Sequence, residues 1–170
     1  LLDEAQKEGL IREYLSLYSK HLQPSLEAAI VKFELSSNAL LLRTLLDELR
    51  IFGLHEGLPA QVRTIIKAKS AEAFFNLILK RLDIEYDDAD SQVIQELLTL
   101  IWASEKGLSE HELLSILKIT RLQLSQILSE LDHHLISMNG LLCFSHDYLS
   151  NAVEHRYLKT EKSKVQRHRK

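Results

Sequence analysis

The stretch "LISMNGLLCFSHDYL", Leu135 to Leu149, decides the fold expected for the second half of the chain. Two short apolar runs, "LISM" and "LLCFS", flank Asn139-Gly140, the dipeptide that most strongly indicates a tight β-hairpin turn. His146 and Asp147 follow at once and open a new helical pattern. The stretch therefore predicts a hairpin that leads directly into the first turn of a helix.

Three helical patterns precede this hairpin. The first is a wide apolar stripe from Val93 to Trp102. Ser109 with Glu112, and Thr120 with Gln123, then stand at the spacing of a capping box, in which each side chain bonds the backbone of the other residue. Two short helices joined by a tight turn should therefore follow the longer one. Three helices followed by a β-hairpin predict a winged-helix domain.

The first half of the chain contains helical patterns only. The apolar positions run from Leu10 to Leu22, from Leu26 to Phe33, from Leu42 to Phe52, from Val62 to Ile66 and from Phe74 to Leu82. Each pattern after the first begins near a proline or a capping residue. The acidic run 87–90 is a plausible hinge and helix cap. We therefore predict a mainly α fold with a helical domain over residues 1–86, a winged-helix domain with one hairpin wing over 87–158, and a basic linker over 159–170.

Composition limits the classes of function. The 170 residues carry a formal net charge of −3, so the chain as a whole offers no positive field to a polyanion. The helix expected to enter a DNA groove, residues 121–134, sets Arg121 against Glu130 and Asp132, which disfavours nucleic-acid binding. The basic residues of the tail, from Arg156 to Lys170, are typical of a solvated linker.

Membrane insertion and disulfide bonding are disfavoured too. The longest apolar runs fall far short of the roughly 20 residues that a membrane span needs. A single cysteine, Cys143, excludes an internal disulfide and fits a reducing compartment, so we expect a cytoplasmic protein. The chain begins at Leu1 without an initiator methionine, and we expect it to be an excerpt of a longer protein.

Four blocks of the sequence carry a resemblance to a known family. They read "SSNALLLRTLLDELRIFGLHEGLP", "LILKRLDIEY", "LTLIWASEKGLSEHELLSIL" and "LLCFSHDYLSNAVEHRYL". In this order and spacing they resemble the C-terminal part of the ATPase module in STAND-class P-loop NTPases, in particular NACHT-type modules of nephrocystin-like and bacterial repeat proteins. The resemblance covers the chain from about Leu10 to Tyr157.

The resemblance implies a nucleotide switch. In such proteins a nucleotide-binding domain precedes a helical and a winged-helix domain, which close over ADP at rest and swing away when ATP replaces it. The implied partners are the upstream nucleotide-binding domain and a downstream repeat or sensor domain of the same chain, together with further copies when the activated protein oligomerises. ADP or ATP is the implied cofactor, with Mg²⁺ bound by a domain outside this chain.

The chain itself lacks the parts that would hydrolyse a nucleotide. Its five glycines never fall at the Gly-x-x-x-x-Gly-Lys-Ser/Thr spacing of a phosphate-binding loop, and no strand-terminal acidic pair offers magnesium ligands. We therefore expect this chain to be non-catalytic, whereas the resemblance implies that the parent protein is an ATPase.

His146 is the first candidate for nucleotide contact. The resemblance implies that the histidine of the family's His-Asp motif contacts the β-phosphate of ADP, and "FSHD" places His146 there. A residue on the first turn of a helix lies among backbone N–H groups that favour an anion. Asp147 would orient the loop or cap the helix. The alternative is that His146 and Asp147 only cap the helix.

Three residues near the start of another helix are the remaining candidates. Asn38-Ala39 stands where the resemblance implies contact with adenine and ribose, although related sequences commonly carry proline at the position of Ala39. Without proline the fixed backbone angle is lost. Arg43 follows one turn later and would face either solvent or a phosphate. A Ser-Asn helix cap without nucleotide contact is the alternative for Asn38.

The sequence is also compatible with other functions. One is a helical and winged-helix adaptor that binds proteins and has no nucleotide role; a DNA-binding regulator is a weaker alternative. A zinc site from Cys143, His133, His134 and His146 is disfavoured, because their spacing matches no common ligand pattern. Catalysis by Cys143 is disfavoured too, because a thiol between Leu142 and Phe144 is expected to be buried and protonated.

Overall fold

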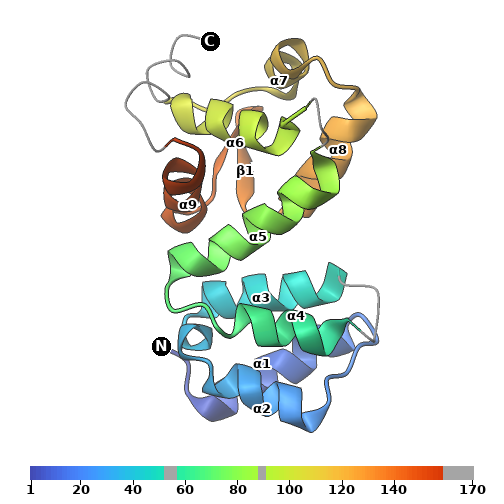
Figure 1. The fold of residues 1–170 in the computed structure, drawn as a ribbon, viewed down its shortest axis with the longest axis vertical. Coiled ribbons are helices and arrows are strands. Elements are labelled where there is room, and N and C mark those ends of the chain that lie inside the picture. Colours follow the sequence, from blue (N-terminus) through green and yellow to red (C-terminus); the bar gives the residue numbers. More distant parts are fainter. Residues whose placement is uncertain (52–56, 88–90, 159–170) are drawn as a thin grey trace. The chain divides into compact units, whose positions relative to one another are not determined.

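The computed structural model describes residues 1–51, 57–87 and 91–158. The described chain is mainly helical and contains a small two-stranded antiparallel sheet, as predicted. It divides into two compact units, Leu1–Phe74 and Phe75–Lys170, each of which is described by itself. Figure 1 shows the order of the elements along the chain.

The first unit consists of helices. They are α1 (Glu4–Ser16), α2 (Pro24–Lys32), the 3-10 helix η1 (Glu34–Ser37), α3 (Ala39–Ile51), α4 (Leu58–Ile65) and the start of α5 (Ala71–Tyr86). α1 packs against α2 and α3, and α4 packs against the same two helices. The core comes from apolar side chains that recur at helical spacing, among them Ile11, Leu15, Leu26, Ile30, Leu42, Leu45, Leu46, Leu49, Val62 and Ile65.

The first helix ends earlier than its apolar pattern indicates. Ser19 adopts a left-handed backbone with φ of 54°. Its N–H donates to the carbonyl of Ser16 at 3.0 Å, and the N–H of Lys20 donates to the carbonyl of Leu15 at 3.0 Å. This pair of bonds is a Schellman motif, which satisfies the last carbonyls of a helix. The prediction that the helix continues to Leu22 is therefore wrong.

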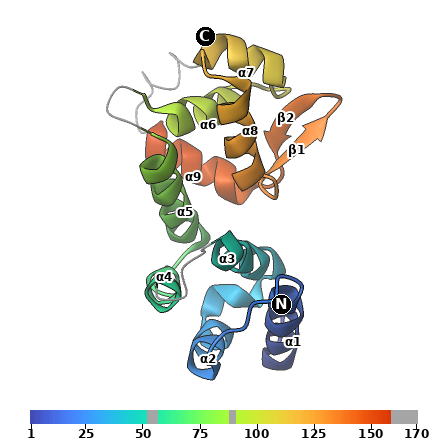
Figure 2. The ribbon, with the colours of Figure 1, turned by 90° about the vertical axis from the view of Figure 1, so that its right-hand side faces the viewer.

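The second unit contains the helices and strands expected of a winged helix (Figure 2). After α5 come α6 (Val93–Ala103), α7 (Glu110–Leu117), α8 (Arg121–Glu130), β1 (Leu135–Met138), β2 (Leu141–Phe144) and α9 (Asp147–Tyr157). Both predicted capping boxes are present, Ser109 with Glu112 and Thr120 with Gln123. α6 packs against α7, β2 and α9, which places it at the centre of this unit.

The hairpin has the turn that its sequence predicts. Asn139 and Gly140 both have positive φ, 53° and 79°, as a type I′ turn requires. The register pairs Leu135 with Phe144 and Met138 with Leu141. On its other edge, β2 is bridged by the segment before α7, where Leu108 pairs with Leu142. Within the described residues, the free edge of β2 is therefore bridged to the segment before α7, whereas the other edge of β1 pairs with no further strand.

Most of α5 belongs to the second unit by its contacts. The carboxylate of Asp83 accepts hydrogen bonds from Arg156 and Tyr157 of α9, and Arg81 Nη2 lies 3.2 Å from the carboxylate of Glu130 in α8. The units accordingly divide within α5, at Phe74 and Phe75.

The acidic run 87–90 is partly described. The carboxylate of Asp87 accepts a hydrogen bond from the N–H of Ile94 at 3.0 Å, so this residue caps the start of α6 as expected. Residues 88–90 and the predicted linker 159–170 lie outside the described residues. The boundary predicted between residues 86 and 87, and the linker, therefore stay predictions.

Candidate functional site

Asn38, Ala39 and Arg43 share the first two turns of α3. The side-chain oxygen of Asn38 accepts hydrogen bonds from the N–H groups of Leu40 at 2.9 Å and Leu41 at 3.4 Å, so Asn38 caps the helix. Ala39 is the first helical residue and is exposed. Arg43 is exposed as well, one turn further along. The sequence thus located a helix start correctly, and nucleotide contact there stays a prediction.

Arg43 shares a buried carboxylate with other groups of the first unit. Arg43 Nε lies 3.9 Å from Asp47 Oδ2, and Arg50 Nε lies 3.9 Å from Asp47 Oδ1. The hydroxyl of Tyr14 donates a hydrogen bond to Asp47, and burial together with this bond raises the pKa of Tyr14. A phosphate at this helix start would compete with Asp47 for Arg43.

His146 caps α9 in the second unit. It has an extended backbone, and its Nδ1 accepts a hydrogen bond from the N–H of Leu149 at 3.4 Å. Asp147 is the first helical residue and is exposed, where its charge complements the positive end of the helix. The helix cap that was the alternative interpretation is present, whereas the phosphate contact stays a prediction.

The other ring nitrogen of His146 faces a second histidine. His146 Nε2 lies 3.3 Å from Nδ1 of His134, which is 4% exposed. Because Nδ1 of His146 accepts a hydrogen bond, its proton belongs on Nε2, from which it is donated to Nδ1 of His134. Both rings pack on Phe75 of α5, with ring centroids 5.5 and 5.2 Å away. The pair is therefore a neutral, partly buried contact between two segments.

Burial keeps both imidazoles uncharged. Desolvation, followed by the proximity of His146, His133 and Arg81, lowers the pKa of His134 to about 3. Desolvation also lowers the pKa of His146, and Asp147 opposes this shift only in part. At neutral pH the pair thus carries no positive charge with which to attract an anion.

This pair makes stability depend on pH in the mildly acidic range. His134 has a pKa near 6.5 when unfolded and about 3 when folded, so below pH 6.5 the unfolded state binds more protons. The stabilisation is fully present above pH 6.5 and is lost as the pH falls toward 3. Between pH 7.5 and pH 4.5 we expect a loss of about 3 kcal/mol from His134, measured by urea unfolding.

A matched variant separates this loss from the titration of carboxylates. In His134→Asn the side-chain oxygen can still accept from His146, but the side chain does not titrate. The variant should lose about 3 kcal/mol less than the parent chain over the same pH interval. An equal loss in the two proteins would contradict the assignment of the effect to His134.

Sequence reasoning named His146 but did not predict its contact with His134. The signal was available in the hairpin, because His134 directly precedes β1 and only Ser145 separates His146 from the end of β2. The register that pairs Leu135 with Phe144 therefore brings the two flanking segments together. The N–H of Ser145 donates to the carbonyl of His134 at 2.9 Å, which continues this pairing.

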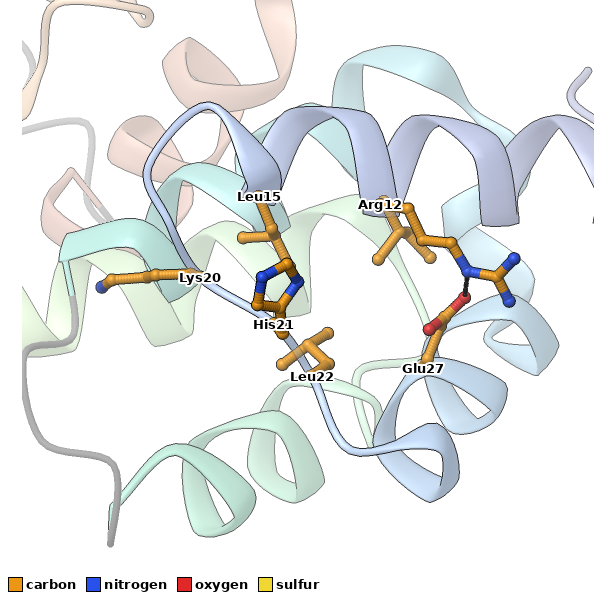
Figure 3. A pocket seen from close by; sticks show the side chains of 7 residues that line it. Arg12, Leu15, Lys20, His21, Leu22 and Glu27 are labelled. Carbon is orange, nitrogen blue, oxygen red and sulfur yellow. Dashed lines mark ion pairs between the residues drawn. The ribbon is translucent and has the colours of Figure 1, made fainter.

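A small cavity lies in the first unit, between α1, the loop after it and α2 (Figure 3). Its volume is about 160 Å³, and Ile11, Leu15 and Leu22 supply apolar walls. Arg12 and Glu27 form an ion pair at its edge, with Arg12 Nε 2.6 Å from a carboxylate oxygen. Pockets for drug-sized ligands usually measure roughly 300 Å³ or more, so this cavity is too small for a nucleotide.

Cys143 differs from its expected burial. It lies on the outward face of the hairpin and is half-buried, with Sγ 3.4 Å from the carbonyl of Lys106. The expectation of a fully buried thiol is wrong, because Cys143 is only half-buried, like the other three residues of β2. Within the described ranges, no group of three or more His, Cys, Asp or Glu side chains is placed to hold a metal ion.

Comparison with known proteins relates this chain to a segment of a much longer protein. A TPR repeat-containing protein of Dictyostelium discoideum is 30% identical to this chain over 168 residues. The match covers 97% of this chain and 10% of the relative, so the chain spans about a tenth of that protein's length. No family model matches, and no solved structure matches. In the described part of the chain, no helix has the length and apolar character needed to cross a bilayer.

Proposed function

We propose that this chain is a non-catalytic, protein-binding segment of a larger repeat-containing polypeptide. The observation that carries the proposal is the match of almost the whole chain to one tenth of a protein whose name specifies TPR repeats. Such repeats stack pairs of helices into extended binding surfaces. A helical unit and a winged-helix unit beside them provide further surfaces on which other parts of the same polypeptide can dock.

Charge supports a protein partner over a nucleic acid. The exposed side chains of α8 include one cation, Arg121, with Gln123, Ser125, Gln126 and Ser129 as uncharged neighbours. A nucleic-acid surface needs several cations for phosphate contacts.

Cross-linking of the full-length polypeptide tests the proposal. Lysines of the second unit, for example Lys106 and Lys118, are exposed and accept amine-reactive cross-linkers. We expect reproducible cross-links from these lysines to residues outside the 170-residue segment. Lys32 and Lys67 are exposed in the first unit. Cross-links from these two lysines show in the same way which surface of that unit contacts other parts of the polypeptide. Cross-links confined to the segment itself would contradict the proposal.

A second candidate function is the lid of a STAND/NACHT-type nucleotide switch. Its support is the location of His146 and of Asn38, Ala39 and Arg43, each at the start of a helix, as the resemblance implies. In this proposal the chain closes over ADP bound mainly by an upstream domain, which also binds Mg²⁺. ATP exchange then releases the lid and permits oligomerisation. His146 would have to release His134 or Leu149 to contact a phosphate.

Two substitutions of one residue separate phosphate contact from helix capping. His146→Ala removes both the imidazole and the cap, whereas His146→Asn removes the imidazole and retains a good capping residue. If His146 contacts the phosphate, we expect the full-length protein to retain ADP about tenfold less tightly in both variants, a change of about 1.4 kcal/mol. The ADP released after denaturation of the purified protein measures this. Unchanged retention in His146→Asn would contradict the contact.

A further inference from the structure

The outward face of the hairpin is apolar. Along β1, Leu135 is 7% exposed, whereas Ile136 and Met138 are 42% and 58% exposed. Ile136 and Met138 therefore share the face opposite to the buried one. The register places Cys143 opposite Ile136 and Leu141 opposite Met138, so all four side chains lie on one side of the sheet. We call these four residues the outer wing face. Ile136 and Met138 are its exposed residues, whereas Leu141 and Cys143 are half-buried and Cys143 Sγ lies 3.4 Å from the carbonyl of Lys106.

This composition is unusual for a solvated sheet. An antiparallel sheet that buries one face normally carries polar residues on the other, and charged residues protect exposed edge strands. Residues 135–144 contain no charged side chain, although 26% of the chain is charged. The outer wing face therefore lacks the cations that a polyanion needs and the charges that an oppositely charged peptide needs. Its complement is an uncharged, apolar surface.

The size of the face indicates a tethered partner. Stable interfaces between free proteins use roughly 20–30 residues on each side, many more than the four of the outer wing face. Tethering on one chain supplies an effective concentration of about a millimolar and makes a small contact sufficient. A second free copy of this chain would lack that advantage.

We infer that the outer wing face binds an apolar helical face from another segment of the same polypeptide. The inference rests on the proposed protein-binding function and names a surface for it. β1 has four residues, so an added strand would gain few backbone hydrogen bonds, and side-chain packing must supply the contact. Helical repeats, as in the related protein, present such faces.

Amide hydrogen exchange tests this inference. Exchange of residues 135–144 is compared in the 170-residue chain and in the full-length polypeptide, each as the parent sequence, as Met138→Lys and as Leu122→Lys. We expect exchange at least tenfold slower in the parent full-length protein than in the chain. Met138→Lys should abolish this difference because it places a charge on the outer wing face. Leu122→Lys, an exposed position on α8, should preserve it.

The outcomes are distinct. Equal exchange in the two proteins, or protection that survives Met138→Lys, overturns the inference. A concentration-dependent dimer of the 170-residue chain that Met138→Lys removes assigns the face to a second copy and also overturns it. Urea unfolding checks that Met138→Lys changes the stability of the chain by less than about 0.5 kcal/mol, as expected at an exposed position. Cross-links to other segments without wing protection would leave the proposed function standing and reject this surface.

Discussion

Gly107→Ala is expected to destabilise the second unit by about 3 kcal/mol or more. Gly107 has φ of 88°, a conformation that costs a residue with a Cβ roughly 1–2 kcal/mol. The new Cβ would also lie 2.5 Å from Cys143 Sγ and 2.6 Å from the carbonyl oxygen of Leu142. Leu142 is paired with Leu108 through bonds of 2.8 and 3.2 Å, so the clash meets backbone that cannot move freely. Urea unfolding followed by circular dichroism measures the loss.

Two other glycines are controls for this effect. Gly140 also has positive φ, 79°, but a Cβ there meets nothing within 4 Å, so Gly140→Ala should cost only about 1 kcal/mol. Gly9 lies inside α1 with open space around it, and Gly9→Ala should stabilise the first unit by up to about 1 kcal/mol. Equal losses for Gly107→Ala and Gly140→Ala would show that the contact between the wing and residues 106–108 does not form.

Asp83→Ala is expected to cost about 2–3 kcal/mol, the second large effect. One carboxylate oxygen accepts from Arg156 Nε at 3.1 Å and Nη2 at 2.6 Å, and the other accepts from the hydroxyl of Tyr157 at 2.6 Å. Charged hydrogen bonds of this kind contribute more than neutral ones, and the ion pair is mostly shielded from water. Burial and Asp83 raise the pKa of Tyr157, and the loss of the carboxylate should lower it.

A neighbouring ion pair supplies the matched control. Glu85 lies two residues further along α5 and pairs with Arg81 at 2.8 Å, but its side chain is 48% exposed. Glu85→Gln should therefore change the free energy of unfolding by less than about 0.5 kcal/mol. If Asp83→Ala costs no more than Glu85→Gln, the end of α5 does not stabilise the second unit through Asp83.

Local sequence patterns were sufficient to predict the helix starts and the hairpin turn of the second unit. Asn139-Gly140 predicted the turn because few dipeptides tolerate positive φ at both positions. Ser109 and Thr120 predicted helix starts because hydroxyl caps act within three residues. Such features depend on neighbours in the sequence, and the structure has them where expected.

Local patterns could not predict features that depend on residues far apart in the sequence or on an unusual residue at a helix end. The end of α1 depends on Ser19 in a left-handed conformation that glycine would normally occupy, so no glycine marked it. The assignment of most of α5 to the second unit depends on Asp83 meeting residues more than seventy positions away. For the candidate site, the sequence placed His146 at a helix start, but not its contact with His134.

Calorimetric titration measures whether this chain binds other parts of its own polypeptide. In the calorimeter, the 170-residue chain is titrated with the rest of the full-length polypeptide, which is expressed without this segment. We expect a saturable one-to-one complex with a Kd tighter than about 100 μM, because a contact of that strength is about nine-tenths formed at the effective concentration of about a millimolar within one polypeptide. The parallel titration with Met138→Lys should bind more weakly. If the parent chain shows no binding at about 100 μM, it does not dock on other parts of its polypeptide as proposed.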